Sequence, residues 1–170
     1  QFRCNGSDSY LSWLDDVLEI KETAKFDGFD LNYDFKIFSD PNDLKKAIVE
    51  KNNINNKSRL VAGYCWNWVK EGKSKKEIHD IKIPEKNFSM SWNLGNTATW
   101  LIDEESIDEV GCIHTSQGLE LDYVGVIIGN DLREEGDKII TDFNERAKTD
   151  SSLRGIKKLY KENPLKANTI

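Results

Sequence analysis

The stretch from Glu109 to Leu132, EVGCIHTSQGLELDYVGVIIGNDL, constrains the fold more than any other part of the chain. It holds two short apolar runs, residues 110–113 and 124–129, separated by a polar segment with a glycine. Short runs that are apolar throughout and rich in β-branched residues are typical of strands in a parallel sheet covered on both faces. Ligands of such sheets bind at the carboxyl ends of the strands, so we expect a site in the polar segment.

The rest of the chain alternates between helical and strand patterns, which predicts an α/β domain with a mainly parallel sheet. Residues 77–83 and 87–92 alternate weakly around a proline, and this pattern predicts a small polar β-hairpin inserted at about residues 66–100. Asp40 and Pro41 are the expected cap and first residue of a helix that ends in the asparagine-rich residues 52–56. The remaining predictions are a helix after Ser7, strands at residues 35–38, 59–65 and 138–141, and a final helix capped by Ser151 and Ser152.

Composition sets limits on the function. The 170 residues suit one domain, and a formal net charge of -6 provides no overall basic field for nucleic acid, so that any such binding requires a local patch. No 18-residue apolar run is present, and three widely separated cysteines predict core thiols in a reducing cytoplasm. The start at Gln1 suggests a piece of a longer protein.

Three segments resemble a known family in the same order along the chain. HTSQGLELDYVGVIIG, which starts at His114, resembles motif V of superfamily 1 helicases, and Gln1-Phe2-Arg3 resembles the motif that opens their second RecA-like domain. RLVAGYCWNW from Arg59 and MSWNL from Met90 are similar to the bacterial and viral DNA/RNA helicase domains grouped with the Schlafen proteins. The resemblance covers essentially residues 1–170.

The resemblance implies a three-layer RecA-like (P-loop NTPase-like) domain that forms half of a motor. The sequence contains no G-x-x-x-x-G-K-[ST] phosphate loop and no acidic Walker B strand, both of which the family carries in its first RecA-like domain. The implied partners are therefore that first domain of the same parent chain and a DNA or RNA strand. The implied cofactor is ATP with Mg²⁺ in the parent, and we expect this chain by itself to be inactive.

The resemblance assigns Arg3 as the catalytic arginine that reaches the γ-phosphate. A guanidinium suits this role because it remains charged and offers a fork of donors to phosphate oxygens. The alternative is a surface arginine near a chain end.

The resemblance places Gln117, Gly118 and Glu120 against the nucleotide. Gly118 permits a close backbone approach or a positive φ, and Glu120 can accept hydrogen bonds from ribose hydroxyls. The alternative is a polar loop whose side chains, Ser116 above all, cap the following turn.

The same motif places His114, Thr115 and Ser116 at the sugar-phosphate backbone of the nucleic acid. Cys112 and His114 do not amount to a zinc ligand set, which needs three or four ligands at recognisable spacings, so we expect no metal site in the chain.

Two further features have alternative interpretations. Trp66, Trp68, Trp92 and Trp100 favour either base stacking or a small satellite core. Four lysines at positions 70, 73, 75 and 76 favour either phosphate contacts or a solvated loop. The sequence as a whole predicts the C-terminal RecA-like domain of an ATP-dependent DNA/RNA helicase or translocase. The alternative is a degenerate RecA-like module that binds nucleic acid or protein without motor activity.

Overall fold

The computed structural model describes residues 8–18, 20, 28–29, 33–69, 75–93, 98–136 and 138–167. The chain divides into two compact units: residues 1–39 with 134–139, and residues 40–133 with 140–170. The predicted Gln1-Phe2-Arg3 motif lies outside the described residues. No helix in the described part of the chain is long and apolar enough to cross a membrane.

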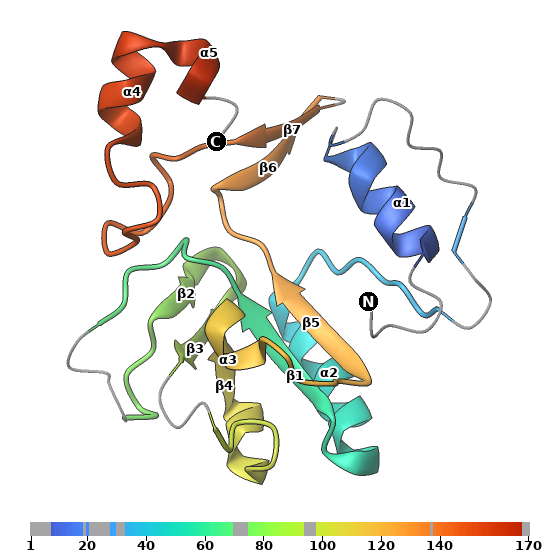
Figure 1. The fold of residues 1–170 in the computed structure, drawn as a ribbon. Helices are drawn as coiled ribbons and strands as arrows, with labels where there is room; N and C mark the ends of the chain where they lie inside the picture. Colours follow the sequence, from blue (N-terminus) through green and yellow to red (C-terminus); the bar gives the residue numbers. More distant parts are fainter. Residues whose placement is uncertain are drawn as a thin grey trace. The chain divides into compact units, whose positions relative to one another are not determined.

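The first unit contains helix α1 (Asp8–Val17; Figure 1). It also contains a cluster of aromatic side chains. The Phe35 ring lies 4.7 Å from the ring centres of both Trp13 and Phe29. The predicted strand at residues 35–38 is wrong, because this segment pairs with no other strand. Phe35 instead packs against other aromatic rings, whereas Ile37 is 82% exposed.

The second unit begins with helix α2 (Pro41–Asn55), whose ends are those that the sequence predicts. The Asp40 carboxylate accepts a hydrogen bond from the Asn42 backbone N–H at 2.8 Å, and Pro41 occupies the first turn, where no N–H is needed. At the other end, Asn56 takes a left-handed conformation with φ 56° and its N–H bonds the Asn52 carbonyl. The chain then turns directly into an inner strand of the sheet.

The main sheet has five strands in the order β2-β3-β4-β1-β5. β3, β4, β1 and β5 are parallel, and β2 is antiparallel to β3 at the edge. The mixed α/β class and the mainly parallel sheet are thus confirmed, and β3 joins the expected hairpin to the main sheet. The bounds are β1 (Ser58–Ala62), β2 (Ile81–Ile83), β3 (Phe88–Trp92), β4 (Glu109–Gly111) and β5 (Tyr123–Ile127).

Short helical segments complete the second unit, and a second hairpin has residues in both units. The 3₁₀ segments are η2 (Pro84–Lys86) and η3 (Glu104–Asp108), and α3 (Ile113–Ser116) follows β4. β6 (Leu132–Glu135) pairs with β7 (Lys138–Thr141), which confirms the predicted strand at 138–141. The final helices are α4 (Ile156–Glu162) and α5 (Pro164–Ala167).

The predicted serine cap of the last helix is wrong. Ser152 donates from its N–H and hydroxyl to the Asp150 carboxylate, at 2.8 and 2.6 Å, which holds residues 150–152 in a turn. Gly155 then takes a φ of 91° and becomes the residue before α4. The helix therefore begins at Ile156, where a glycine has allowed the chain to change direction.

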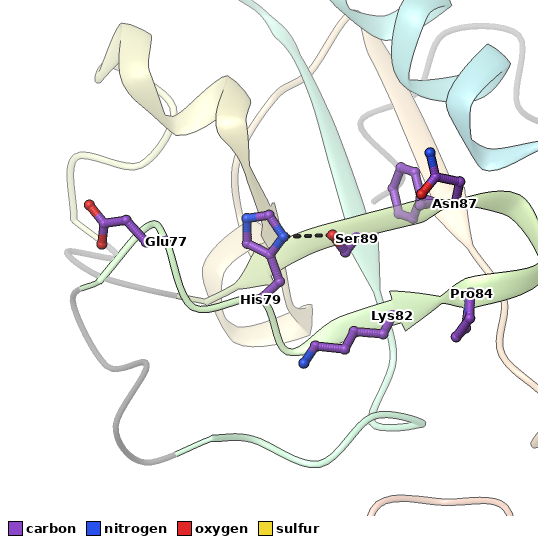
Figure 2. Close-up of a pocket in the computed structure, with 7 residues that line it drawn as sticks. Glu77, His79, Lys82, Pro84, Asn87 and Ser89 are labelled. Carbon is purple, nitrogen blue, oxygen red and sulfur yellow. Dashed lines mark hydrogen bonds between the residues drawn. The ribbon is translucent and has the colours of Figure 1, made fainter.

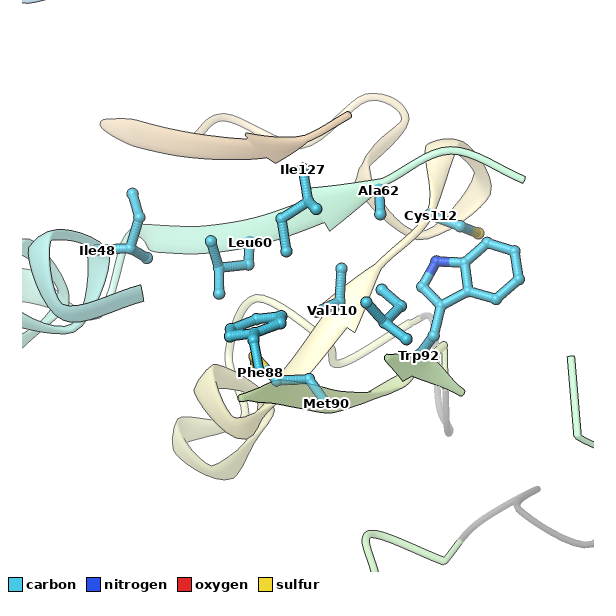
Figure 3. Close-up of a cluster of buried hydrophobic side chains, with 10 residues drawn as sticks. Ile48, Leu60, Ala62, Phe88, Met90, Trp92, Val110, Cys112 and Ile127 are labelled. Carbon is cyan, nitrogen blue, oxygen red and sulfur yellow. The ribbon is translucent and has the colours of Figure 1, made fainter. Parts of the chain in front are cut away.

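The core lies between α2 and one face of the sheet (Figure 3). Gly125 of β5 faces α2, and a Cβ at this position would lie 2.6 Å from Leu60 Cδ2 and 2.8 Å from Ile48 Cγ1. A larger residue there would push the helix away from the sheet. The buried cluster consists of Ile48, Leu60, Ala62, Ile81, Phe88, Met90, Trp92, Val110, Cys112 and Ile127.

On the opposite face of the sheet, the side chains of β5 remain about half exposed. Val124 is 48% exposed and Val126 is 53% exposed. The prediction that this strand is buried on both faces is therefore wrong within the described structure. Nearer the centre of the same face, Trp100 closes over Gly111, where a Cβ would lie 2.5 Å from the indole.

Arg59 is fully buried on that second face and joins three parts of the unit. Its Nε donates to Ser106 Oγ at 2.8 Å, and its Nη1 donates to Asn52 Oδ1 at 2.6 Å. Its Nη2 donates to the carbonyls of Leu101 and Asp103 at 3.0 and 3.1 Å. All of these acceptors are uncharged, so that hydrogen bonds rather than an ion pair compensate for burial of the cation.

Burial lowers the pKa of the Arg59 guanidinium, although Asp103 and Glu109 act in the opposite direction. The group remains charged at neutral pH, because an arginine titrates far above that range. The charge stays in the interior only while its donors are satisfied.

We expect Arg59→Lys to destabilise the chain by about 2–4 kcal/mol, because a lysine offers three donors from a single point and leaves buried carbonyls unpaired. Urea unfolding followed by circular dichroism measures this loss. Arg154→Lys, at an exposed position before α4, is the matched control and should change stability by less than about 0.5 kcal/mol. Equal stability of both variants would contradict the structural role of Arg59.

Candidate functional site

The candidate site lies at the carboxyl edge of the parallel strands. Because β3, β4, β1 and β5 run in the same direction, the segments that follow them meet at one edge of the sheet. Those segments begin at Asn93, Cys112, Gly63 and Ile128, respectively. The polar loop predicted from the sequence, residues 114–120, thus lies where α/β proteins bind ligands.

The first turn of this loop is held by its own hydroxyl groups. Thr115 is 4% exposed, and its Oγ1 accepts a hydrogen bond from the Cys112 N–H at 2.6 Å. Ser116 Oγ donates to the Cys112 carbonyl at 3.1 Å. Both hydroxyls therefore stabilise the α3 turn from within, rather than capping a following helix, and the Thr115 side chain is buried. The prediction that these two side chains bind nucleic acid is not tested by their placement, but the turn they form presents the neighbouring His114 to solvent.

The residues assigned to the nucleotide are exposed and follow the same turn directly in the sequence. The side chains of Gln117 and Glu120 form no hydrogen bond or ion pair with any residue that the structure describes. Gly118 has a φ of 81°, and a Cβ there would have open space around it. The glycine is thus required by the backbone conformation, because an L side chain is disfavoured at this φ.

These residues fit a nucleotide in chemical type. Gln117 supplies an amide that donates and accepts, and Glu120 supplies a carboxylate for sugar hydroxyls. A phosphate group needs cationic donors in addition, and neither residue provides one. The loop therefore has the composition of the sugar-binding half of a nucleotide site, and the placement of Arg3 is outside the described residues.

Sequence reasoning missed Asn93, which joins the end of β3 to the α3 turn. Its backbone has a φ of 52°, its N–H bonds the Val110 carbonyl at 2.8 Å, and its Oδ1 lies 3.3 Å from Thr115 Oγ1. Asparagine adopts the left-handed region more readily than most residues. The sequence signal that could have identified this residue is an asparagine directly after the strand-like run MSW.

Tyr64, just after β1, was also missed. Its ring packs edge-on against Trp92 with the ring centres 4.7 Å apart. Burial raises the pKa of the Tyr64 hydroxyl, and the nearby Cys112 and Asp150 add to the effect, so that the phenol remains protonated at neutral pH. Tyr64 thus helps to pack the carboxyl edge of the sheet.

The tryptophans behave mainly as core residues. Trp92 and Trp100 are 1% and 2% exposed, and Trp68 packs edge-on against Trp92. Trp92 and Trp100 thus have no free face for a base, and Trp92 belongs to the main core rather than to a satellite core. Of the four clustered lysines, Lys70 and Lys73 lie outside the described residues, and Lys76 pairs with Glu105 at 2.5 Å.

An arginine with two carboxylates fastens a later segment to the same edge. Arg146 donates to Asp131 at 3.1 Å and, through Nε and Nη2, to Asp150 at 2.8 and 2.6 Å. The Ala147 N–H bonds the Tyr64 carbonyl, which places this segment against the end of β1. Among the described residues, no group of three or more His, Cys, Asp or Glu side chains is arranged to hold a metal ion.

A family model, Schlafen group 3, DNA/RNA helicase domain, matches residues 1–170. The chain belongs to this family. The resemblance seen in the sequence motifs is therefore confirmed over the whole chain, and the loop at residues 114–120 lies within a helicase-type domain.

A curated relative from Saccharomyces cerevisiae, the uncharacterized protein YPL245W, is 27% identical over 147 residues. The match covers 78% of this chain and 31% of the yeast protein, so the chain spans about a third of that relative's length. No solved structure matches the chain.

The Asp150 carboxylate should make stability depend on acid pH. Burial opposes its ionisation, but hydrogen bonds from Ser152 and Arg146 outweigh burial and lower the pKa of Asp150. A carboxylate whose pKa is lowered by folding stabilises the folded state above the unfolded pKa, and this contribution disappears as the pH falls through the folded pKa.

We expect Asp150→Asn to cost about 1–3 kcal/mol of unfolding free energy at pH 7, with the difference from wild type shrinking as the pH falls below about 4. Urea unfolding at several pH values measures it. Asp16→Asn, at an exposed position in α1, is the control and should change little at any pH. A difference for Asp150→Asn that stays constant down to acid pH would contradict the role of its charge.

Proposed function

We propose that this chain is the second RecA-like domain of an ATP-dependent DNA/RNA helicase or translocase. The single observation that carries the proposal is the family match over residues 1–170, combined with a polar, exposed loop at the carboxyl edge of the sheet. ATP with Mg²⁺ would supply the free energy through hydrolysis of its γ-phosphate. Most of the ATP contacts would come from a first RecA-like domain of the same parent protein, and the other partner would be DNA or RNA.

In this proposal the polar loop at residues 114–120, called the α3 loop below, holds one side of the nucleotide. Gly118, at φ 81°, turns the backbone between Gln117 and Glu120, so that both exposed side chains can face the same ligand. Glu120 accepts from the sugar hydroxyls, and Gln117 bridges toward the nucleic-acid side. Arg3 would stabilise charge on the transferring phosphoryl group, which is the main task of a protein in phosphoryl transfer.

The nucleic acid lies, in the same proposal, on the other side of the turn. His114 is exposed and contributes a ring that donates to phosphate or stacks on a base. Thr115 and Ser116 contribute indirectly, because their hydroxyls hold the turn that presents His114. One short turn would then contact both ligands, which suits a protein that couples hydrolysis to movement.

The proposal is tested in the parent protein by measuring nucleic-acid-stimulated ATP turnover. We expect Arg3→Ala to lower kcat by roughly 10³-fold or more, as for other arginine fingers. Glu120→Ala should raise KM for ATP about tenfold through loss of a charged hydrogen bond. Glu162→Ala, on the exposed side of α4, is the matched control and should leave turnover unchanged.

Two outcomes would overturn the motor assignment. Wild-type turnover in both Arg3→Ala and Glu120→Ala would remove the nucleotide site from this chain. Robust ATP hydrolysis by the isolated 170 residues, unaffected by Arg3→Ala, would mean that the chain has a complete site of its own. Binding of nucleic acid by a parent without any ATP turnover would instead favour a binding module.

A further inference from the structure

The β2–β3 hairpin presents a polar outer face. Ile81, Phe88 and Met90 point into the core and are at most 4% exposed. Lys82 and Ser89 are directly opposite each other in the antiparallel register, and both are exposed. Side chains on a β-ribbon alternate between faces, so these two residues share the side away from the core.

His79 is fixed on this face. Its Nδ1 lies 2.7 Å from Ser89 Oγ, which orients the ring across the hairpin (Figure 2). The next residue, Asp80, is 6% exposed, and its carboxylate accepts hydrogen bonds from the N–H groups of Val69 and Trp92 at 2.7 and 3.1 Å. The backbone beside His79 is thereby tied to the end of β3 and to Val69, and the contact with Ser89 orients the ring before any ligand arrives.

A pocket of about 320 Å³ lies over these side chains. Its donors are an imidazole, an ammonium group, a hydroxyl and an amide, and the Lys82 ammonium has no ion-pair partner among the described residues. Glu77 is the acidic residue of the lining. The residues around the pocket are Glu77, His79, Lys82, Pro84, Asn87, Phe88 and Ser89 (Figure 2).

We propose that this pocket binds a phosphodiester group of single-stranded nucleic acid, with the phosphate at Lys82, His79 and Ser89 and the adjacent sugar against Pro84. This inference rests on the proposed function and adds a second contact for the same strand. Phosphates are bound by mixed hydroxyl, amide and cationic donors of this kind. An acidic protein segment would require several cations, and here the lining holds one lysine and one glutamate.

The connection to the α3 loop runs along β3. Ser89, near the start of this strand, contacts His79, and Asn93, directly after its end, contacts Thr115 beside His114. A strand of nucleic acid contacted at His114 would therefore have a second anchor on the same rigid element. Two anchors on one strand would fix the position of the nucleic acid relative to the nucleotide loop.

The test is binding of the full-length protein to a labelled single-stranded oligonucleotide about 20 nucleotides long, which exceeds the site size of a single small domain. We expect Lys82→Ala to weaken binding about three- to tenfold at low salt and to reduce the slope of log K against log salt by about 0.7. Ser89→Ala should weaken binding less, because it keeps the lysine. Glu77→Gln should tighten binding about twofold, because it keeps the lysine and removes a negative charge that repels the phosphate.

Lys157→Ala, on the exposed side of α4, removes the same charge elsewhere and should leave affinity within about twofold of wild type. The unfolding midpoint of each variant checks that the hairpin remains folded. Parallel titrations with DNA and RNA of the same sequence give the preferred sugar, and a phosphoserine peptide of equal charge serves as the competing class of ligand.

If Lys82→Ala binds the oligonucleotide as tightly as the wild type, or if Lys157→Ala weakens binding equally, the proposed role of the pocket is overturned. The proposed function is then left intact. Displacement of the oligonucleotide by the phosphopeptide at equal charge would assign the pocket to a protein ligand instead. Absence of binding by the wild-type protein would overturn both proposals. Two results together would support both proposals: impaired ATP turnover in Glu120→Ala, and weaker oligonucleotide binding in Lys82→Ala.

Discussion

The buried guanidinium of Arg59 determines much of the second unit, because no other described residue can replace its set of donors. It connects the inner strand β1 to the end of α2 through Asn52 and to the turn before β4 through Leu101 and Asp103. Its carbon lies 6.0 Å from the Trp100 ring, which in turn closes over Gly111. The start of β4, and hence the position of the loop that follows it, depends on this internal charge.

That loop combines a rigid inner side with a free outer side. Inside, the Thr115 hydroxyl is buried against Cys112 and Asn93. Outside, the side chains of Gln117 and Glu120 form no hydrogen bond or ion pair with a described residue. Because the backbone of the turn is already fixed, ordering on ligand binding is confined to these side chains, so the arrangement favours binding over stability.

The parts of the fold that could be predicted are those in which local chemistry and tertiary packing agree. The cap at Asp40 and the carboxyl edge after β4 are of this kind. The predicted strand at 110–113 ends early, at Gly111, because Cys112 caps a turn and leaves Ile113 68% exposed. Arg59 could not be recognised as a buried residue, since its acceptors are carbonyls and amides that only the folded chain brings together. The inward Thr115 and the contact from Asn93 depend on the pairing of β3 with β4 in the same way.

The Thr115 hydroxyl also offers a way for one turn to respond to the two proposed ligands. It accepts from the Cys112 N–H, and its single proton can be donated either to the Cys112 carbonyl at 3.0 Å or to Asn93 Oδ1 at 3.3 Å. The first choice tightens the turn on itself, and the second ties it to the end of β3. In the proposed function, a ligand at Gln117 and Glu120 would act directly after this four-residue helix and a ligand at His114 would act within it, so that both would bias this one donor. Coupling between the two proposed ligands would then require no long pathway, because the element that they share is a single turn with two alternative hydrogen bonds.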